Sequence, residues 1–436
     1  MKVLFVGHDL TYARFYAAIE HCLKNRAEVV AQHVYFRPSA FLFAKHGLGL
    51  RCSSPSLRRL LVTPRASSEA PPASIDFRFY EPTTAVQRQF LTRLYQAYLA
   101  FLKPLFEREA YDVCVLPGEF RLMEQAVLAA LKAGGQTARI LYFEAGPPGY
   151  VYFDPSGVNA NASFTSTGKS ELLTQARSES PGARVGAASP LGKPVRRGLR
   201  PLLLCVDVAW IFLAKITQGL GDLEEYWVAT RNRLRRLSAP AAHDGAPSEG
   251  RAVSRPPGAS SLVVYVGQVR NDINHTHFGV TAAELGRRLT HLLESDPTVF
   301  LVWRDHPLER SDALFLQLSA AFPGRVGRSG ARSLRDDLQH AQGVVTVNSN
   351  GGLEALAAGL PVLLLGRAYF ENLVGVWRDD AAFGQQRIAA ARSGPDPAIG
   401  ADAARFLRDC FLPIDYRGED FRNAHLAAQA LLVARH

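Results

Sequence analysis

The sequence lacks the marks of a disulfide-bonded, secreted or membrane-spanning protein. Its five cysteines are odd in number and far apart, so neither a disulfide framework nor a cysteine metal site is expected. The apolar part of the N-terminal run MKVLFVGHDL is too short for a signal peptide and leads directly into a turn. The most apolar later run, residues 202–214, is too short to span a bilayer and contains Asp207. These absences predict a cytoplasmic protein, in which residues 202–214 form a buried or interfacial helix.

The sequence also lacks a basic stripe with interleaved aromatic residues, although its formal charge is +10. The excess arginines are scattered or lie in loops, so nucleic acid is not an expected partner. A pI near 9.5 still favours anionic partners, such as a nucleotide or a lipid headgroup. The basic residues 193–200, directly before the apolar run, would suit peripheral contact with an anionic membrane surface.

What the sequence does contain is a repeated alternation of strand and helix patterns. Its 436 residues, 47% hydrophobic and 21% charged, are enough for two globular domains. Strands that alternate with helices predict parallel sheets. We therefore predict an α/β, GT-B-like fold, with two Rossmann-type domains whose parallel sheets face a central cleft. The expected ranges are 1–190 for the first domain, 191–260 for a helical segment and flexible linker, 261–395 for the second domain, and 396–436 for C-terminal helices that pack back.

The stretch VVTVNSNGGLEALAAGLPVLLLG, residues 344–366, is read as strand, polar turn, short helix, loop and strand. Gly351 and Gly352 would let the backbone approach a ligand closely. A strand that enters a helix through small residues forms a ready anion site, because free N–H groups and the helix dipole point the same way. The alternative is an ordinary turn of a doubly wound fold, with no ligand.

Polar groups gather at four predicted strand ends: at Glu144, and within the ranges 268–272, 304–306 and 348–354. Because the carboxyl ends of the strands of a doubly wound sheet converge on one edge, these groups are expected to form one site. Each is weak by itself: Glu144 could be a surface carboxylate, Asp272 could cap a turn, and His306 could be structural. Asn348 and Ser349 could equally be turn formers.

Taken together, these groups suit a nucleotide-sugar transferase. A carboxylate pair can serve as nucleophile and general acid/base. Arg304 and His306 can stabilise a departing phosphate, and the glycine-rich turn can hold phosphate or ribose. The run EAGPPGYVYFDPSGVNANAS, residues 144–163, reads as a long irregular loop of the kind that carries function. No acidic metal-binding pair lies at a strand end, so we expect no cofactor and a metal-independent reaction.

Four segments, in order, resemble the capsular polysaccharide Kdo transferases of Gram-negative capsule assembly, the KpsS/KpsC-like family, and are nearest to its KpsS-like members. They are FEAGPPGYVYFDPSGVNANAS (143–163), VGQVRNDINH (266–275), LVWRDHPLER (301–310) and VVTVNSNGGLEALAAGLPVLLLGRAYF (344–370). Two departures are visible. Ala145-Gly146-Pro147-Pro148 follows the glutamate where the family has glycine and then arginine, and Asn350 replaces a small hydroxyl residue.

The resemblance implies a retaining GT-B enzyme that takes Kdo from CMP-Kdo, with an acceptor-binding first domain and a donor-binding second domain. Carried over by position, Asp272 would be the nucleophile or its close partner, Glu144 the acid/base, and His306 part of the catalytic motif. The residues that would line the donor site are Gln268, Asn271, Arg304, Pro307, Asn348, Ser349, Asn350, Gly352 and Glu354.

The same resemblance implies the partners. They would be a CMP-sugar donor, a phosphatidylglycerol-type lipid or glycan acceptor, and an inner-membrane capsule assembly complex, with the protein cytoplasmic or peripheral on that membrane. Two alternatives stay open at this point. One is a non-catalytic capsule assembly or export protein that keeps the fold, and the other is a transferase for a different nucleotide sugar, such as a UDP donor.

Overall fold

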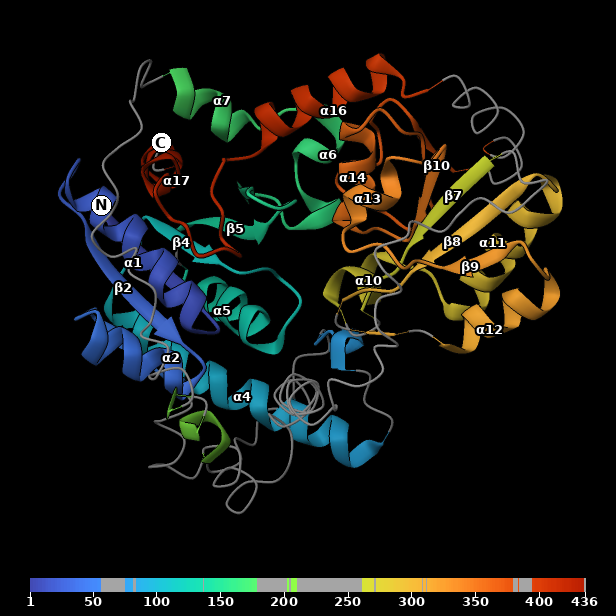
Figure 1. Ribbon diagram of the computed structural model, residues 1–436. Coiled ribbons are helices and arrows are strands. Elements are labelled where there is room, and N and C mark those ends of the chain that lie inside the picture. The colour runs from blue at the N-terminus through green and yellow to red at the C-terminus, as the bar shows by residue number, and fades with distance from the viewer. Residues whose placement is uncertain are drawn as a thin grey trace. The chain divides into compact units, whose positions relative to one another are not determined.

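A computed structural model describes residues 1–55, 75–80, 84–135, 137–178, 202–203, 205–209, 261–269, 272–307, 309–310, 312–378, 383 and 394–434 (Figure 1). These residues divide into two compact units. Unit 1 comprises those within Met1–Ser163, Lys169–Val228 and Cys410–His436, and unit 2 those within Phe164–Gly168 and Ala229–Asp409. Most of the predicted segment 191–260 lies outside the described residues.

Unit 1 contains a six-stranded sheet with the order β3-β2-β1-β4-β5-β6. All neighbouring strands are parallel except the edge pair β5 and β6. Its strands are β1 (Lys2–Gly7), β2 (Val30–Tyr35), β3 (Cys52–Ser53), β4 (Val113–Leu116), β5 (Arg139–Ala145) and β6 (Val151–Asp154). Its helices are α1 (Leu10–Lys24), α2 (Pro38–Leu42), α4 (Ala85–Arg108), α5 (Leu122–Ala133) and α7 (Glu171–Ser178), with single turns at Phe43–Gly47, Arg78–Tyr80 and Asn159–Asn161.

The C-terminal helix α17 (Ala424–Val433) completes the core of unit 1. Its apolar side chains pack with those of α1 and α7 in one buried cluster. Arg14 of α1, which is 1% exposed, makes an ion pair with Glu419 just before α17. Thus the last residues of the chain are part of the first unit's core.

Unit 2 contains a second six-stranded sheet, fully parallel, with the order β12-β11-β10-β7-β8-β9. Its strands are β7 (Ser261–Val266), β8 (Val299–Arg304), β9 (Val326–Arg328), β10 (Gly343–Thr346), β11 (Val362–Leu364) and β12 (Val376–Trp377). Its helices are α6 (Phe164–Thr167), α10 (Ile273–Phe278), α11 (Ala282–Ser295), α12 (Asp312–Ala321), α13 (Leu334–Leu338), α14 (Asn350–Ala357) and α16 (Pro397–Cys410).

Counted along each unit, both sheets have the strand order 3-2-1-4-5-6, which is the order of the doubly wound dinucleotide-binding fold. In such sheets the direction of winding reverses beside the first strand, and ligands bind at the carboxyl ends of the strands there. This switch point lies between β1 and β4 in unit 1, and between β7 and β10 in unit 2. The predicted GT-B-like fold of two Rossmann-type domains is therefore confirmed, while the central cleft stays a prediction.

One expectation about local structure was wrong. The run 144–163 is not irregular throughout, because residues 151–154 form β6 and pair antiparallel with β5, so that the first sheet is mixed rather than parallel. Gly149, at φ +83°, lies in the turn that reverses the chain. Only residues 155–163 form the expected ordered loop, with one helical turn in it.

The apolar run 202–214 is described only at residues 202–203 and 205–209, which are helical. Asp207 is 6% exposed and accepts hydrogen bonds from the backbone N and the Oγ of Ser39 at 3.0 and 2.6 Å. Burial raises the pKa of this carboxyl, and the bonds from Ser39 oppose that shift. In the described part of the chain, no helix combines the length and the hydropathy needed to cross a membrane.

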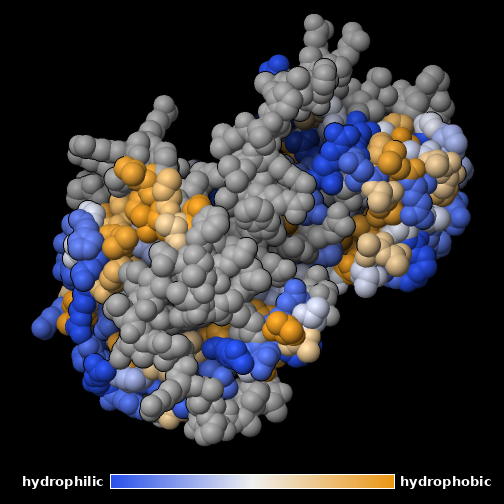
Figure 2. Space-filling view, turned by 90° about the horizontal axis from the view of Figure 1, so that it is seen from below, coloured by the Kyte–Doolittle hydropathy of each residue, from blue (hydrophilic) through white to orange (hydrophobic). Residues whose placement is uncertain are grey.

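Among the described residues, the exposed large hydrophobic side chains are scattered rather than gathered. Val30, Val86, Leu202, Leu316 and Val374 belong to different segments of the chain. On the face drawn in Figure 2, hydrophobic residues occur in several separate groups between hydrophilic ones. Scattered apolar residues of this kind are normal on a protein surface.

Candidate functional site

The switch point of unit 2 is held by a pair of amide side chains, Gln268 after β7 and Asn348 after β10. Gln268 Nε2 donates to Asn348 Oδ1 at 2.6 Å, and Gln268 Oε1 accepts from the backbone N of Asn348 at 3.1 Å. Asn348 is 3% exposed, and its Nδ2 donates to the carbonyl of Asn274 at 2.8 Å. The ends of β7 and β10, which the sequence analysis singled out separately, are thus joined by direct hydrogen bonds, in agreement with their neighbouring positions in the sheet.

The turn from β10 to α14 places the helix N-terminus at the same edge. Ser349 caps α14 by accepting from the backbone N of Gly351 at 3.2 Å. The buried Thr346 hydroxyl donates to the carbonyl of Val266 at 3.3 Å and accepts from the backbone N of Ser349 at 3.2 Å. This network fixes the entry to the helix with uncharged groups, and it places the positive end of the helix dipole at this edge of the sheet.

The remaining predicted donor residues of this turn lie on α14. Asn350 accepts a hydrogen bond from the Tyr369 hydroxyl at 2.5 Å. Gly352 packs so closely against Phe370 that an added Cβ would lie only 2.9 Å from Phe370 Cζ. Glu354 is half-buried on the same helix. Asn348 and Ser349 thus lie in the turn before α14, whereas Asn350 and Gly352, which were expected in that turn, belong to the first turn of the helix.

Arg304 is the last residue of β8, the next strand along from β7, and His306 follows shortly after it. Arg304 Nη1 lies 2.5 Å from Asp337 Oδ2, and Asp337 is 4% exposed and also accepts from the Ser329 hydroxyl. The carbonyl of Arg304 accepts from the backbone N of Gly267 at 2.9 Å, so this strand end is tied to the β7 end. Half-buried His306 forms an isolated bridge with Glu309, and Pro307 is exposed. The guanidinium of Arg304 is thus engaged with a buried carboxylate of its own unit.

Asp272 is exposed and caps the short helix α10. Its Oδ1 accepts from the backbone N of Asn274 at 2.8 Å. This contact is the turn-capping role that the sequence left open, and it engages one of the two carboxylate oxygens. Asn271, a predicted donor residue, lies outside the described residues.

Glu144 lies on β5 of unit 1, in register with Tyr152 of β6. It is half-buried, and its Oε1 accepts from the backbone N of Ala145 at 2.9 Å. Its charge is felt by the buried Tyr12: burial raises the pKa of Tyr12 and Glu144 adds to that rise. Glu144 therefore lies at the carboxyl edge of the unit 1 sheet, near the first turn of α1.

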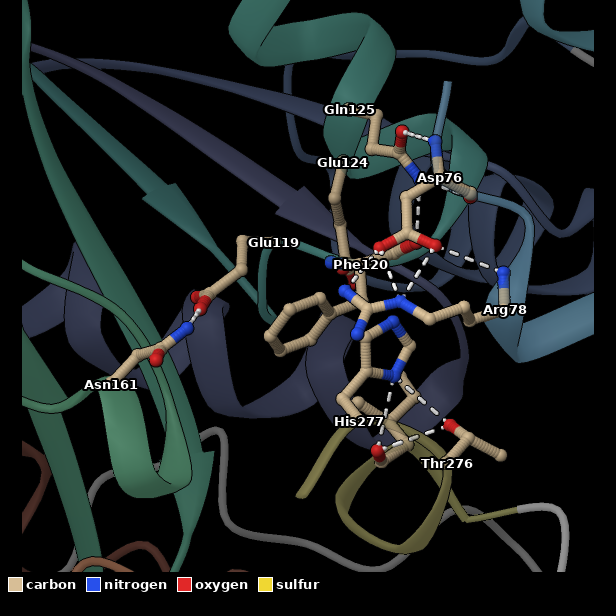
Figure 3. Close-up of polar contacts among 10 residues, drawn as sticks. Asp76, Arg78, Glu119, Phe120, Glu124, Gln125, Asn161, Thr276 and His277 are labelled. Carbon is tan, nitrogen blue, oxygen red and sulfur yellow. Dashed lines mark hydrogen bonds and ion pairs between the residues drawn. The ribbon is translucent and has the colours of Figure 1, made fainter. Parts of the chain in front are cut away.

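The switch point of unit 1 holds a cluster that the sequence analysis missed. His8 follows β1, and its Nε2 lies 3.1 Å from Glu124 Oε1 on α5. Glu124 is fully buried, and its other oxygen accepts from the backbone N of Phe120 at 2.9 Å (Figure 3). The same oxygen accepts from the backbone N of Arg121 at 3.0 Å. Burial, followed by the charges of Arg121 and Arg37, lowers the pKa of His8 well below its usual value. This histidine is therefore neutral near pH 7.

Glu119, in the turn that follows β4 after Pro117 and Gly118, belongs to the same edge and was also missed. Its Oε2 accepts from the backbone N of Val158 at 3.0 Å, and its Oε1 from Asn161 Nδ2 at 2.7 Å (Figure 3). Burial raises the pKa of Glu119 to about 7, although both hydrogen bonds oppose the rise. The signal in the sequence was Pro117-Gly118-Glu119 at a strand end, the same pattern that singled out Glu144.

The two switch points differ in chemistry. That of unit 2 offers amides, hydroxyls and a helix N-terminus, which suit the phosphate and ribose of a nucleotide. That of unit 1 offers carboxyls and a neutral histidine, which suit proton transfer. Within the described ranges, no group of three or more His, Cys, Asp or Glu side chains is arranged to hold a metal ion.

Comparison with known proteins places unit 2 in context. Residues 239–403 match the family model for capsule polysaccharide biosynthesis protein, a stretch that includes every predicted donor residue and excludes Glu144. No curated protein matches the chain in sequence.

Solved structures resemble the chain only distantly. The Thermosulfurimonas dismutans KpsC β-Kdo 2,7 transferase is 14% identical over 74% of this chain and 87% of its own, with a TM-score of 0.35. The UDP-GlcNAc 2-epimerase from Neisseria meningitidis, bound to UDP-GlcNAc, is 13% identical over 94% and 99%, with a TM-score of 0.34. CalG4, the calicheamicin glycosyltransferase, is 14% identical over 98% of both chains, with a TM-score of 0.31. Scores of this size assign no residue to a role.

Proposed function

We propose that this protein is a glycosyltransferase of capsular polysaccharide biosynthesis, which transfers Kdo or a related sugar from CMP-Kdo to a lipid or glycan acceptor. The observation that carries the proposal is the overlap of two independent findings in unit 2. The match to the capsule biosynthesis family covers the β7–α14 region, and the Gln268–Asn348 pair joins the two strand ends at the switch point of that region.

In this proposal the donor binds at unit 2. The N-terminus of α14 receives phosphate oxygens, because the first N–H groups of the helix and its dipole favour an anion there. Gln268, Asn348 and Ser349 fix the edge that the nucleotide contacts. Asp272 attacks the anomeric carbon and the bond to the phosphate of CMP breaks, with His306 assisting departure of the phosphate. The acceptor oxygen then displaces the Asp272 carboxylate from that carbon while Glu144 takes the proton of the acceptor hydroxyl.

The donor class is tested by thermal unfolding of the whole protein with CMP, UDP and GDP. A nucleotide at 100 times its dissociation constant stabilises its site by about 2.7 kcal/mol, so a shift with CMP alone is the expected result. A transfer assay with CMP-Kdo and a phosphatidylglycerol-type lipid follows. A shift with UDP or GDP but not CMP, or no transfer with CMP-Kdo, would overturn the donor assignment.

The role of Asp272 has a matched control in Asp396. Both are exposed and both accept from the backbone N two residues on at 2.8 Å. Asp272→Ala is expected to abolish transfer, as is Glu144→Gln, whereas Asp396→Ala costs only the capping energy of about 1 kcal/mol. Equal activity in Asp272→Ala and Asp396→Ala would leave Asp272 as a helix cap only.

A second candidate is a non-catalytic assembly or export protein that keeps a nucleotide site. The engagement of Arg304 with Asp337 favours it, since this arginine is then not free to stabilise a departing phosphate. Binding of CMP without turnover of CMP-Kdo, with any acceptor offered, would support this candidate over a transferase.

A further inference from the structure

The side chain of Asn274 in unit 2 carries a buried oxygen without a hydrogen-bond partner. Asn274 belongs to α10, the short helix that follows β7. Its Oδ1 is buried and accepts no hydrogen bond from the described residues. Nearly all buried polar atoms of proteins are bonded, because a buried acceptor without a donor costs folding free energy. The described fold of unit 2 therefore leaves this cost uncompensated.

The backbone of Asn274, by contrast, is fixed at both its N–H and its carbonyl. Its N donates to Asp272 Oδ1 at 2.8 Å, and its carbonyl accepts from Asn348 Nδ2 at 2.8 Å. Asn348 is in turn bonded to Gln268 at the switch point. Asn274 is thus held between the proposed nucleophile Asp272 and the amide pair that joins the ends of β7 and β10. This is the edge at which a doubly wound sheet binds its ligand.

Two neighbouring polar side chains of α10 are used within the helix itself. Thr276 Oγ1 donates to the carbonyl of Ile273 at 3.1 Å and lies 2.9 Å from His277 Nδ1 (Figure 3). His277 Nδ1 lies 3.2 Å from the same carbonyl. These contacts hold the helix together. The unbonded oxygen of Asn274 is therefore particular to its position, and it is not shared by the polar side chains that follow it.

The Asn274 oxygen can turn toward a ligand at little cost. The residue is half-buried, so it borders the solvent at this edge although Oδ1 itself is covered. Rotation about the last bond of an asparagine side chain is soft, and here it breaks no hydrogen bond of Oδ1. A carbonyl oxygen selects an O–H or N–H donor. A sugar, which carries several hydroxyls, is a ligand of that chemistry.

We propose that Asn274 binds the donated sugar, with Oδ1 accepting a hydrogen bond from a sugar hydroxyl. This inference rests on the proposed function, in which Asp272 attacks the anomeric carbon of that sugar. Because Asp272 Oδ1 contacts the backbone of Asn274, a sugar that reaches Asp272 also lies beside Asn274. The contact involves residues of unit 2 alone. Asn274 thus distinguishes the sugar nucleotide from the free nucleotide and helps to set the specificity for the donor.

The experiment compares the affinities of the whole protein for CMP and for CMP-Kdo, without acceptor, by calorimetric titration. Asn274→Leu and Asn274→Ala remove the amide and leave side chains of different size. In both variants the affinity for CMP-Kdo should fall about 3–10-fold relative to that for CMP, as expected for one lost hydrogen bond. Thr276→Val is the control on the same helix, because its hydroxyl is bonded to the backbone of α10. It should keep the wild-type ratio of the two affinities.

Thermal unfolding without ligand separates a binding role from a structural one. Asn274→Leu should unfold at or above the wild-type temperature, because it removes a buried acceptor that has no partner. Thr276→Val should unfold below the wild type, because it loses a bonded hydroxyl. A fall in Tm of more than about 4 °C in unliganded Asn274→Leu would make Asn274 a structural residue and overturn the proposal.

The titrations can overturn the proposal in two further ways. Equal losses of affinity for CMP and CMP-Kdo would place the amide on the nucleotide rather than on the sugar. An unchanged ratio in Asn274→Ala would show that no hydrogen bond to the sugar exists, even if the larger side chain of Asn274→Leu obstructed the site. A wild type that transfers no sugar from CMP-Kdo would instead overturn the proposed function itself, and the role of Asn274 with it.

Discussion

At the scale of single residues, surroundings rather than residue type set the chemistry of the unit 1 carboxyls. Glu124 is fully buried and satisfied by three partners, whereas Glu119 has two hydrogen bonds and partial exposure. Glu144, on β5, accepts a hydrogen bond from the backbone N of Ala145. The sequence could single out Glu144 by its strand end. It could not predict which of the three carboxyls is most buried, because the residues that bury them come from segments as distant as residues 8 and 158.

The unit 2 residues were easier to predict from the sequence. Gln268, Asn348 and Ser349 each follow a buried β-branched run, and strand ends of a parallel sheet meet at one edge. The partner of Arg304 was not predictable in that way. Asp337 does not follow a strand pattern in the sequence, and its burial depends on how α13 packs after β9.

Arg304 provides the first prediction at this scale. Replacement by Met should destabilise unit 2 by about 3 kcal/mol in urea unfolding, because it leaves the buried charge of Asp337 without a partner. The double variant Arg304→Met/Asp337→Asn should recover part of this loss, since the remaining amide carries no charge. The matched control is Arg310→Met, whose ion pair with Asp312 is exposed, so its loss should leave the midpoint of urea unfolding near that of the wild type.

The opposite outcome has a clear meaning. If Arg304→Met kept its stability and lost nucleotide binding, the arginine would be the phosphate ligand that its strand-end position predicts. The structural pairing with Asp337 would then be secondary.

At the scale of elements, alternation of strands and helices predicted nearly every strand of the parallel core. The exceptions are the edge strand β6, which the composition of residues 144–163 concealed, and the two-residue edge strands β3 and β12. Gly, Pro and Asn are typical of loops, and here they also build the turn that returns the chain antiparallel to β5. Whether the residues after such a turn form a strand depends on their pairing with a neighbouring strand. The residue pattern of one segment alone does not reveal that pairing.

The packing of α14 against the sheet leads to a prediction about Gly352. An Ala for Gly exchange in a helix normally stabilises by about 0.5–1 kcal/mol. At Gly352 the new Cβ would lie 2.9 Å from Phe370 Cζ and 3.1 Å from Thr346 Cγ2, and both neighbours are fully buried. We therefore expect Gly352→Ala to destabilise by about 1–3 kcal/mol in chemical unfolding and to weaken nucleotide binding.

Gly286 on α11 supplies the control for this exchange. Its added Cβ would meet only the end of the Leu314 side chain, at 3.2 Å. Gly286→Ala should therefore be neutral or stabilising. Equal stability of the two variants would show that α14 can move away from the sheet, contrary to the close packing described here.

At the scale of the whole molecule, two units with the same strand order carry different chemistry at corresponding switch points. The sequence predicted two Rossmann-type domains, because both halves repeat the strand–helix alternation. It also predicted C-terminal helices that pack back on the rest of the protein, but not which of the two domains they pack against. The reason lies in α17 itself: AHLAAQALLV is apolar on nearly all sides, so its pattern indicates burial and names no partner.

The return of α17 to unit 1 gives the last prediction. Leu431 is fully buried in the core that α17 forms with α1 and β1, so Leu431→Ala should cost about 2–5 kcal/mol. Because the loss is local to this core, hydrogen exchange should accelerate at amides of β1, α1 and α17 and stay unchanged at β7 and β10. Leu316→Ala, at a position that is 62% exposed on α12, is the matched control and should leave both units within about 0.5 kcal/mol of the wild type. Faster exchange in β7 and β10 of Leu431→Ala, equal to that in β1, would mean that the two units unfold as one, and the last helix would then stabilise the nucleotide unit as much as its own.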